Sequence, residues 1–136
     1  MFSQKDIATI YSEAYSDFSK KHKIKCSLKF IKEEDFFYLS KKSKLIEENL
    51  IEGIPILVGA LVKHSFKNDT IYMNVDIVNQ ITSDKYFVKS LIIHEFYHVL
   101  LKNKIQSDSL SEEAQSEIRA KETMAREFPQ LSKNIV

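Results

Sequence analysis

Apolar side chains near the start of the chain recur at three- and four-residue spacing, which is typical of an amphipathic helix. The run follows Ser3 and covers residues 4–21. Its apolar positions are Ile7, Ile10, Tyr11, Ala14 and Phe18. The spacing therefore predicts a helix over residues 4–21 that buries one face.

The pattern then changes to alternation, which is typical of a half-buried strand. Alternation covers residues 24–31, with Cys26 on the apolar side. We therefore expect Cys26 to be a buried strand residue and not a nucleophile or a metal ligand.

Two further apolar segments, residues 54–66 and 70–75, flank the polar residues 67–69. Turn-forming residues between two such segments predict a β-hairpin. The polar stretch 41–51 fits either a short helix or a segment that covers the core.

Residues 84–101 carry a wide apolar stripe at helical spacing, which indicates a largely buried helix. The apolar positions are Phe87, Val88, Leu91, Ile92, Phe96, Val99 and Leu100. Thr82, Ser83 and Asp84 precede this run and are candidate N-caps.

A second helix is expected after the polar connector 102–109. Residues 109–112 read Ser-Leu-Ser-Glu, which has the form of a capping box, and Pro129 should end the helix at about Phe128. The expected inward stripe is Ala114, Glu117, Ile118, Ala120, Met124, Ala125 and Phe128.

The order helix, sheet, helix, helix predicts an α+β fold. The chain has 136 residues, of which 43% are hydrophobic, so we expect one domain over residues 1–136 with a core of its own.

The buried helix carries the sequence His-Glu-x-x-His at residues 94–98. Positions four apart lie on one face of a helix, so the imidazoles of His94 and His98 can reach one metal ion. Glu95 would project beside that ion. This pattern is typical of a zinc hydrolase, and a metal would compensate the burial of these polar groups. The alternative is a pair of structural histidines with ordinary partners.

A catalytic zinc usually has three protein ligands and a water. Residues 101–104 lack the third histidine of the metzincin pattern, so a downstream acid must serve. The candidates are Asp108, Glu112, Glu113, Glu117, Glu122 and Glu127.

Glu117 is the acid embedded in the expected inward stripe, and we choose it as the third ligand. Glu112 and Glu113 lie in the first turn, where the helix dipole already explains a carboxylate, and Glu113 is the second choice. Glu122 and Glu127 should lie on the polar side. Glu117 as a solvated surface acid is the alternative.

These residues resemble a known family. His94-Glu95-x-x-His98, followed after eighteen residues by Glu117, is similar to the gluzincin arrangement. Residues 117–129 resemble the E-x-x-A-N/D-x-F-A-x-x-L-x-x-P signature of ImmA/IrrE-type metallopeptidases, and residues 68–74 resemble the strand before their active-site helix. The resemblance covers roughly residues 54–129.

The resemblance implies a minimal zincin-like fold, in which a small twisted sheet packs on the HExxH helix and a second helix bears the third ligand. It implies a zinc cofactor and a specific protein substrate, often a transcriptional repressor encoded nearby. The usual Gly before the second His is Tyr97 here, and the usual Asn or Asp after the ligand Glu is Lys121. These two positions favour the alternative of a zincin-fold protein that binds a regulatory partner without cleaving it.

The expected chemistry is amide hydrolysis by an enzyme in which Glu95 takes a proton from the attacking water and passes it to the leaving amine. Candidate donors to the oxyanion are Tyr97, Tyr72 and His64. An edge strand from the hairpin 54–75 would pair with extended substrate. Iron, cobalt or manganese would also suit two His and one carboxylate.

Composition narrows the remaining classes. The net charge of +1 gives no electrostatic case for nucleic-acid binding, and the lysines around residues 20–25 and 41–44 fit a solvated surface. A single cysteine excludes an internal disulfide and fits a reducing compartment. No apolar run resembles a signal peptide or approaches transmembrane length, so we expect a cytoplasmic protein.

Overall fold

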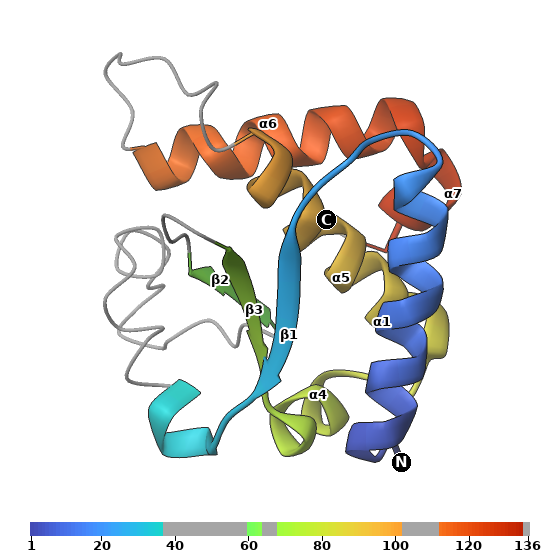
Figure 1. Cartoon of the computed structure of the whole chain (residues 1–136). Helices are drawn as coiled ribbons and strands as arrows, with labels where there is room; N and C mark the ends of the chain where they lie inside the picture. The colour runs from blue at the N-terminus through green and yellow to red at the C-terminus, as the bar shows by residue number, and fades with distance from the viewer. Residues whose placement is uncertain (37–59, 64–67, 102–111, 135–136) are drawn as a thin grey trace, which may run out of the picture.

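The computed structural model describes residues 1–36, 60–63, 68–101 and 112–134 (Figure 1). These residues form a mixed helix and strand structure, with which the predicted α+β class is compatible. The elements are α1 (Gln4–Ser19), β1 (Cys26–Phe30), β2 (Ala60–Lys63), β3 (Asp69–Met73), α4 (Val75–Ile81), α5 (Lys85–Leu101), α6 (Glu112–Glu127) and α7 (Pro129–Ser132).

The described strands form a small sheet in the order β1-β3-β2. β1 runs parallel to β3, with Leu28 opposite Ile71, and β2 runs antiparallel to β3. The antiparallel pairing of β2 with β3 confirms the predicted hairpin for its described part. Asp69 of the predicted turn 67–69 already belongs to β3, and residues 54–59 and 64–67 lie outside the described residues. Alternation in β1 is also confirmed, because Cys26 is half-buried and its neighbour Ser27 is exposed.

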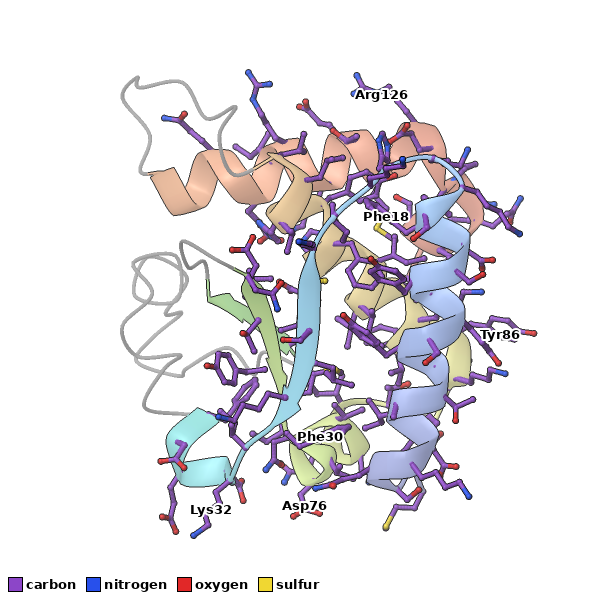
Figure 2. The ribbon with its side chains drawn as sticks, in the orientation of Figure 1. Phe18, Phe30, Lys32, Asp76, Tyr86 and Arg126 are labelled. Carbon is purple, nitrogen blue, oxygen red and sulfur yellow. The ribbon has the colours of Figure 1, made fainter. Side chains whose placement is uncertain are left out.

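Helices α1 and α5 form a layer against one face of this sheet (Figure 1). The core between them joins Phe18 of α1, Ile71 and Met73 of β3, and Phe96 of α5. Figure 2 shows Phe18 on the inner side of α1, while Tyr86 at the start of α5 points outward. The helix with the HExxH motif therefore lies beneath the sheet, in the centre of the molecule.

Helix α1 begins where the sequence predicts. The backbone N–H of Asp6 donates to Ser3 Oγ at 3.1 Å, and the backbone N–H of Ser3 donates to Asp6 Oδ2 at 2.9 Å. This reciprocal pair is a capping box, which satisfies N–H groups that have no partner within the helix. The helix ends at Ser19, two residues before the predicted end.

A helix follows β3 that the sequence analysis does not predict. The strand expected over residues 70–75 ends at Met73, and Val75 already belongs to α4. Asn74 causes the change, because its side-chain oxygen accepts the backbone N–H of Ile77 at 2.9 Å and caps the helix. The signal was present in the sequence as an N-cap residue followed by Ile77 and Val78, both of which are buried.

Helix α6 buries a narrower stripe than predicted. Ala120 and Met124 are buried as expected, but Ile118 and Ala125 are exposed, so these two predictions are wrong. Among the described residues, α6 packs mainly on α5 and α7. A helix that packs on one neighbouring helix buries only the side chains three or four positions apart along the contact. The helix ends at Glu127, next to the predicted end, and Pro129 begins α7.

Three other predictions fall outside the described residues: the segment 41–51, the connector 102–109 and most of the capping box 109–112. Among the described residues, no helix combines the length and apolar character that crossing a bilayer requires.

Candidate metal centre

Helix α5 places the motif. Asp84 directly precedes α5, and its side chain accepts a hydrogen bond from the backbone N–H of Tyr86 at 2.9 Å. This agrees with Asp84 as a predicted N-cap candidate. The helix is buried on nearly all sides around the motif, so its polar residues lie among apolar neighbours. His94 and Glu95 are both buried, at 4% and 9% exposure. Polar groups in such surroundings need partners.

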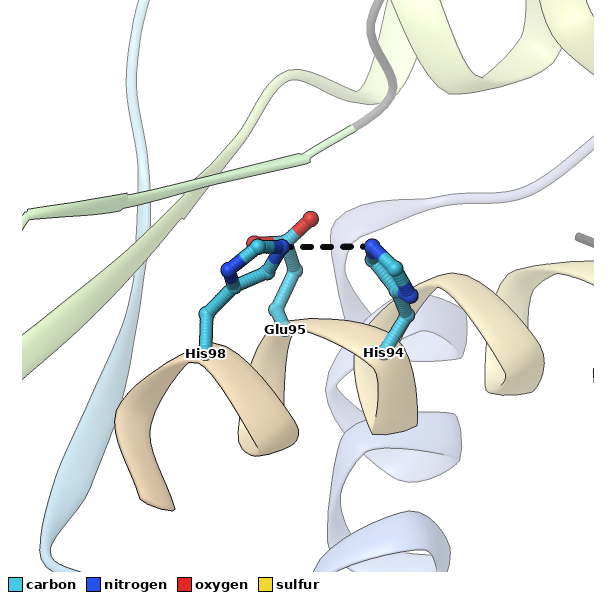
Figure 3. Close-up of side chains that lie close together, drawn as sticks. All are labelled: His94, Glu95 and His98. Carbon is cyan, nitrogen blue, oxygen red and sulfur yellow. Dashed lines mark hydrogen bonds between the residues drawn. The ribbon is translucent and has the colours of Figure 1, made fainter. Parts of the chain in front are cut away.

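The two motif histidines face each other across one helical turn. Their Nε2 atoms are 3.2 Å apart. Figure 3 shows both rings and the Glu95 carboxyl rising from the same side of α5. Candidate ligand atoms of His94, Glu95 and His98 all lie within 4.8 Å of one another. The i, i+4 spacing thus produces the convergence that the sequence predicts.

Glu117 joins these histidines from the neighbouring helix α6. Its Oε1 is 2.7 Å from His94 Nε2, and its Oε2 is 3.1 Å from His98 Nε2. Partial burial alone would raise the pKa of Glu117, but the hydrogen bonds and charge interactions with the two imidazoles outweigh it and hold this pKa well below its ordinary value. The carboxyl is therefore ionised and oriented toward both Nε2 atoms.

Glu95 behaves differently although it lies beside the same histidines. Its pKa is raised to about 8, mainly by burial; the nearby Glu117 also raises it, and His98 lowers it. Two carboxyl groups near one site thus differ in charge at neutral pH when no cation is present. A cation bound nearby would favour the ionised form of Glu95.

The distances between donor atoms suit a small metal ion. Ligands about 2.0 Å from a tetrahedral zinc are separated from one another by roughly 3.3 Å. The observed separations among His94 Nε2, His98 Nε2 and the Glu117 oxygens are 2.7, 3.1 and 3.2 Å. Small outward shifts of these side chains would admit such an ion, and the donor set of two imidazoles and one carboxylate is one that zinc binds.

His94 Nδ1 is buried and has no hydrogen-bond partner among the described residues. In metal-binding histidines this nitrogen usually donates to a carboxylate, a carbonyl or a water. The orientation of the His94 ring therefore depends on packing within α5 and on the contacts of its Nε2.

The other acids of α6 occupy different places. Glu122 is exposed, as predicted. Glu127 does not lie free on the polar side, and that prediction is wrong: its Oε1 accepts the Tyr97 hydroxyl at 2.9 Å and lies 2.7 Å from His22 Nε2. The side chains of Glu112 and Glu113, and the whole of Asp108, lie outside the described residues.

Of the three candidate oxyanion donors, the two that the structure describes, Tyr97 and Tyr72, do not point to the histidines. The Tyr97 ring is fully buried and its hydroxyl is occupied by Glu127. Tyr72 alternates with Ile71 and Met73 along β3, and these two neighbours face the core with α5, so Tyr72 faces the opposite side of the sheet. His64 lies outside the described residues.

The sequence analysis noted Lys121 only as a departure from the family signature and did not predict that its side chain lies close to Glu117. Lys121 Nζ is 3.9 Å from Glu117 Oε1, one helical turn away on α6. The i, i+4 spacing from Glu117 was the signal that could have found it.

Comparisons with protein-family models, with curated proteins and with solved structures found no match. The function must therefore be argued from the residues and their geometry.

Proposed function

We propose that this protein is a zinc-dependent metallopeptidase of the gluzincin type, with His94, His98 and Glu117 as metal ligands and Glu95 as general base. The observation that carries the proposal is the convergence of His94 Nε2, His98 Nε2 and the Glu117 carboxylate, from two helices, within 2.7–3.2 Å of one another. Glu117 follows His98 by 19 residues and His94 by 23, yet its carboxylate lies within hydrogen-bond distance of both.

The roles follow from the chemistry of the side chains. Zinc in such a site lowers the pKa of a water and polarises a substrate carbonyl. Glu95 would hold the proton that the attacking water gives up and return it to the leaving amine. Its burial excludes bulk water from that proton, and its position one residue after His94 keeps it beside the ligands.

The arrangement of elements supports a zincin-like fold and a relationship to the ImmA/IrrE-type metallopeptidases. A small mixed sheet lies against α5, and α6 supplies the acid. β2 is an edge strand of the described sheet and contacts α5, so extended substrate could pair along it. We propose a specific protein substrate, and the resemblance to this family favours a transcriptional repressor.

The proposal is tested by Glu95→Gln. Zinc-loaded wild type, Glu95→Gln and the exposed control Glu122→Gln are incubated with a mixture of folded cellular proteins, and new peptide termini are identified by mass spectrometry. We expect cleavage by wild type and by Glu122→Gln, and a loss of at least a hundredfold in Glu95→Gln with zinc retained.

Two results would contradict this assignment. Equal cleavage by wild type and Glu95→Gln would mean that Glu95 is not the base or that the activity is a contaminant. Zinc binding by all three proteins without cleavage, together with retention of a captured partner by Glu95→Gln, would favour the alternative of a protein that binds its partner without cutting it.

A further inference from the structure

Lys121 is the cation that helix α6 brings to the rim of the proposed site. Its Nζ lies 3.9 Å from Glu117 Oε1, which is beyond hydrogen-bond distance. The side chain is 43% exposed, whereas that of Glu117 is 23% exposed. The ammonium group is therefore close to the ligand set, but its N–H donors are not committed to the carboxylate.

Amide hydrolysis at this site needs such a donor. When water adds to a carbonyl carbon, the electron pair of the C=O double bond moves to oxygen, and the water proton passes to the base. The resulting negative charge is stabilised by positioned donors. Tyr97 and Tyr72, the two aromatic candidates that the structure describes, point elsewhere.

The reach of Lys121 matches this requirement. A carboxylate oxygen lies about 2.0–2.2 Å from a zinc ion that it binds. If Oε1 coordinates, the ammonium group is at most about 6 Å from the ion, given its 3.9 Å separation from that oxygen. A lysine has a flexible four-carbon stem and three rotatable donors, so its ammonium group can follow an anion bound to that ion.

We propose that Lys121 binds the negative charge of a ligand at the metal centre and stabilises the oxyanion of the substrate. The inference rests on the proposed function. It assigns a role to a residue that differs from the Asn or Asp of the family signature.

The proposal has two opposite consequences for one substitution. A positive charge near the site attracts an anionic ligand and repels a metal cation. Removal of that charge should weaken anion binding and should leave metal binding equal or tighter. A purely structural role of Lys121 would not produce this pair of effects, because damage to the site would weaken both.

The test uses the full chain loaded with cobalt(II), whose visible absorption reports changes in its ligands. Inorganic phosphate is titrated into wild type, Lys121→Met and Lys121→Arg, and the cobalt content is measured after each titration. Arg126→Met is the matched control. Arg126 is an exposed cation of the same helix, nine residues after Glu117 and thus about 13 Å further along the axis, and it points away from the molecule (Figure 2).

We expect Lys121→Met to weaken phosphate binding at least tenfold, with cobalt affinity unchanged or increased. Lys121→Arg should stay within about threefold of wild type, and Arg126→Met should equal it. Phosphate affinity of Lys121→Met within threefold of wild type would overturn the inference while the metal centre stands. A parallel loss of cobalt and phosphate would also overturn it. Failure of wild type to bind cobalt would overturn the proposed function and, with it, the role of Lys121.

Discussion

At the scale of single residues, the environment gives two nearby glutamates opposite properties. Glu117 faces two imidazoles, and these contacts lower its pKa. Glu95 is buried on α5, and burial raises its pKa to about 8. In the proposed mechanism the first would hold a cation permanently, and the second would exchange a proton near neutral pH.

Glu95→Gln should make the metal-free protein more stable at high pH. The folded-state pKa of Glu95 is raised from 4.5 to about 8, so its contribution to stability is fully present below pH 4.5 and is lost as pH rises through 8. Glutamine removes this loss. The gain in the free energy of unfolding should be near zero at pH 4 and up to about 5 kcal/mol at pH 9.

Urea denaturation of chelator-treated protein at several pH values measures this difference. Glu122→Gln, an exposed substitution on α6, serves as the control and should show no such pH dependence. A Glu95→Gln variant whose advantage does not grow between pH 4 and pH 9 would show that the buried carboxyl does not titrate as described.

At the scale of elements, the position of α6 decides whether Glu117 meets the histidines. Ala120 and Met124 pack α6 on α5, and Glu127 fixes its end through the Tyr97 hydroxyl of α5 and His22, which follows α1. One carboxylate thus joins α6 to α5 and to the segment that follows α1. Partial burial alone would raise the pKa of Glu127, but its hydrogen bonds to His22 and Tyr97 lower it.

Glu127→Gln should loosen α6 in a pH-dependent way. Because the folded-state pKa is lowered, the stabilisation by Glu127 is present above its ordinary value of 4.5 and is lost as pH falls through the lower folded-state value. We expect a loss of about 1–2 kcal/mol in the free energy of unfolding at pH 7, with a smaller difference from wild type at pH 3.5. Chemical denaturation at both pH values checks this, and an equal loss at both would contradict it.

The spacing of apolar residues within one segment was enough to predict the longer helices and strand β1. The spacing of Ile7, Ile10, Ala14 and Phe18 gave α1, and alternation gave β1. The short helices α4 and α7 were missed, because one or two turns contain too few residues to display a period.

Contacts between distant segments were beyond such patterns. The parallel pairing of β1 with β3 joins residues more than forty positions apart, and His22 meets Glu127 across 105 positions. Glu117 was chosen as a ligand from its place in an apolar stripe, and its carboxylate lies beside both histidines, although its neighbour Ile118 in that stripe is exposed. The predicted stripe identified the face of α6 that is buried but included too many residues. The width of a buried face depends on how many elements pack on the helix, which the pattern within one segment does not reveal.

At the scale of the whole molecule, the proposed metal centre connects α5, which packs against the sheet, to α6. α5 packs on α1 and β2, whereas within the described residues α6 and α7 pack mainly on α5 and on each other. A metal held by both helices would therefore fasten the C-terminal pair to the body of the molecule. A ligand that binds only the folded state raises the free energy of unfolding, and the increase grows with the logarithm of the ratio of ligand concentration to Kd.

The central claim is a metal site with three protein ligands, and metal content tests it most directly. Wild type, Glu117→Ala and the control Glu122→Ala are purified without added metal and analysed by inductively coupled plasma mass spectrometry. We predict about one zinc per chain in wild type and in Glu122→Ala, and a loss of at least tenfold in Glu117→Ala, since removal of a ligand weakens binding strongly. Wild type that holds no metal, even after zinc is supplied, would contradict the account, and zinc retained in full by Glu117→Ala would remove Glu117 from the site.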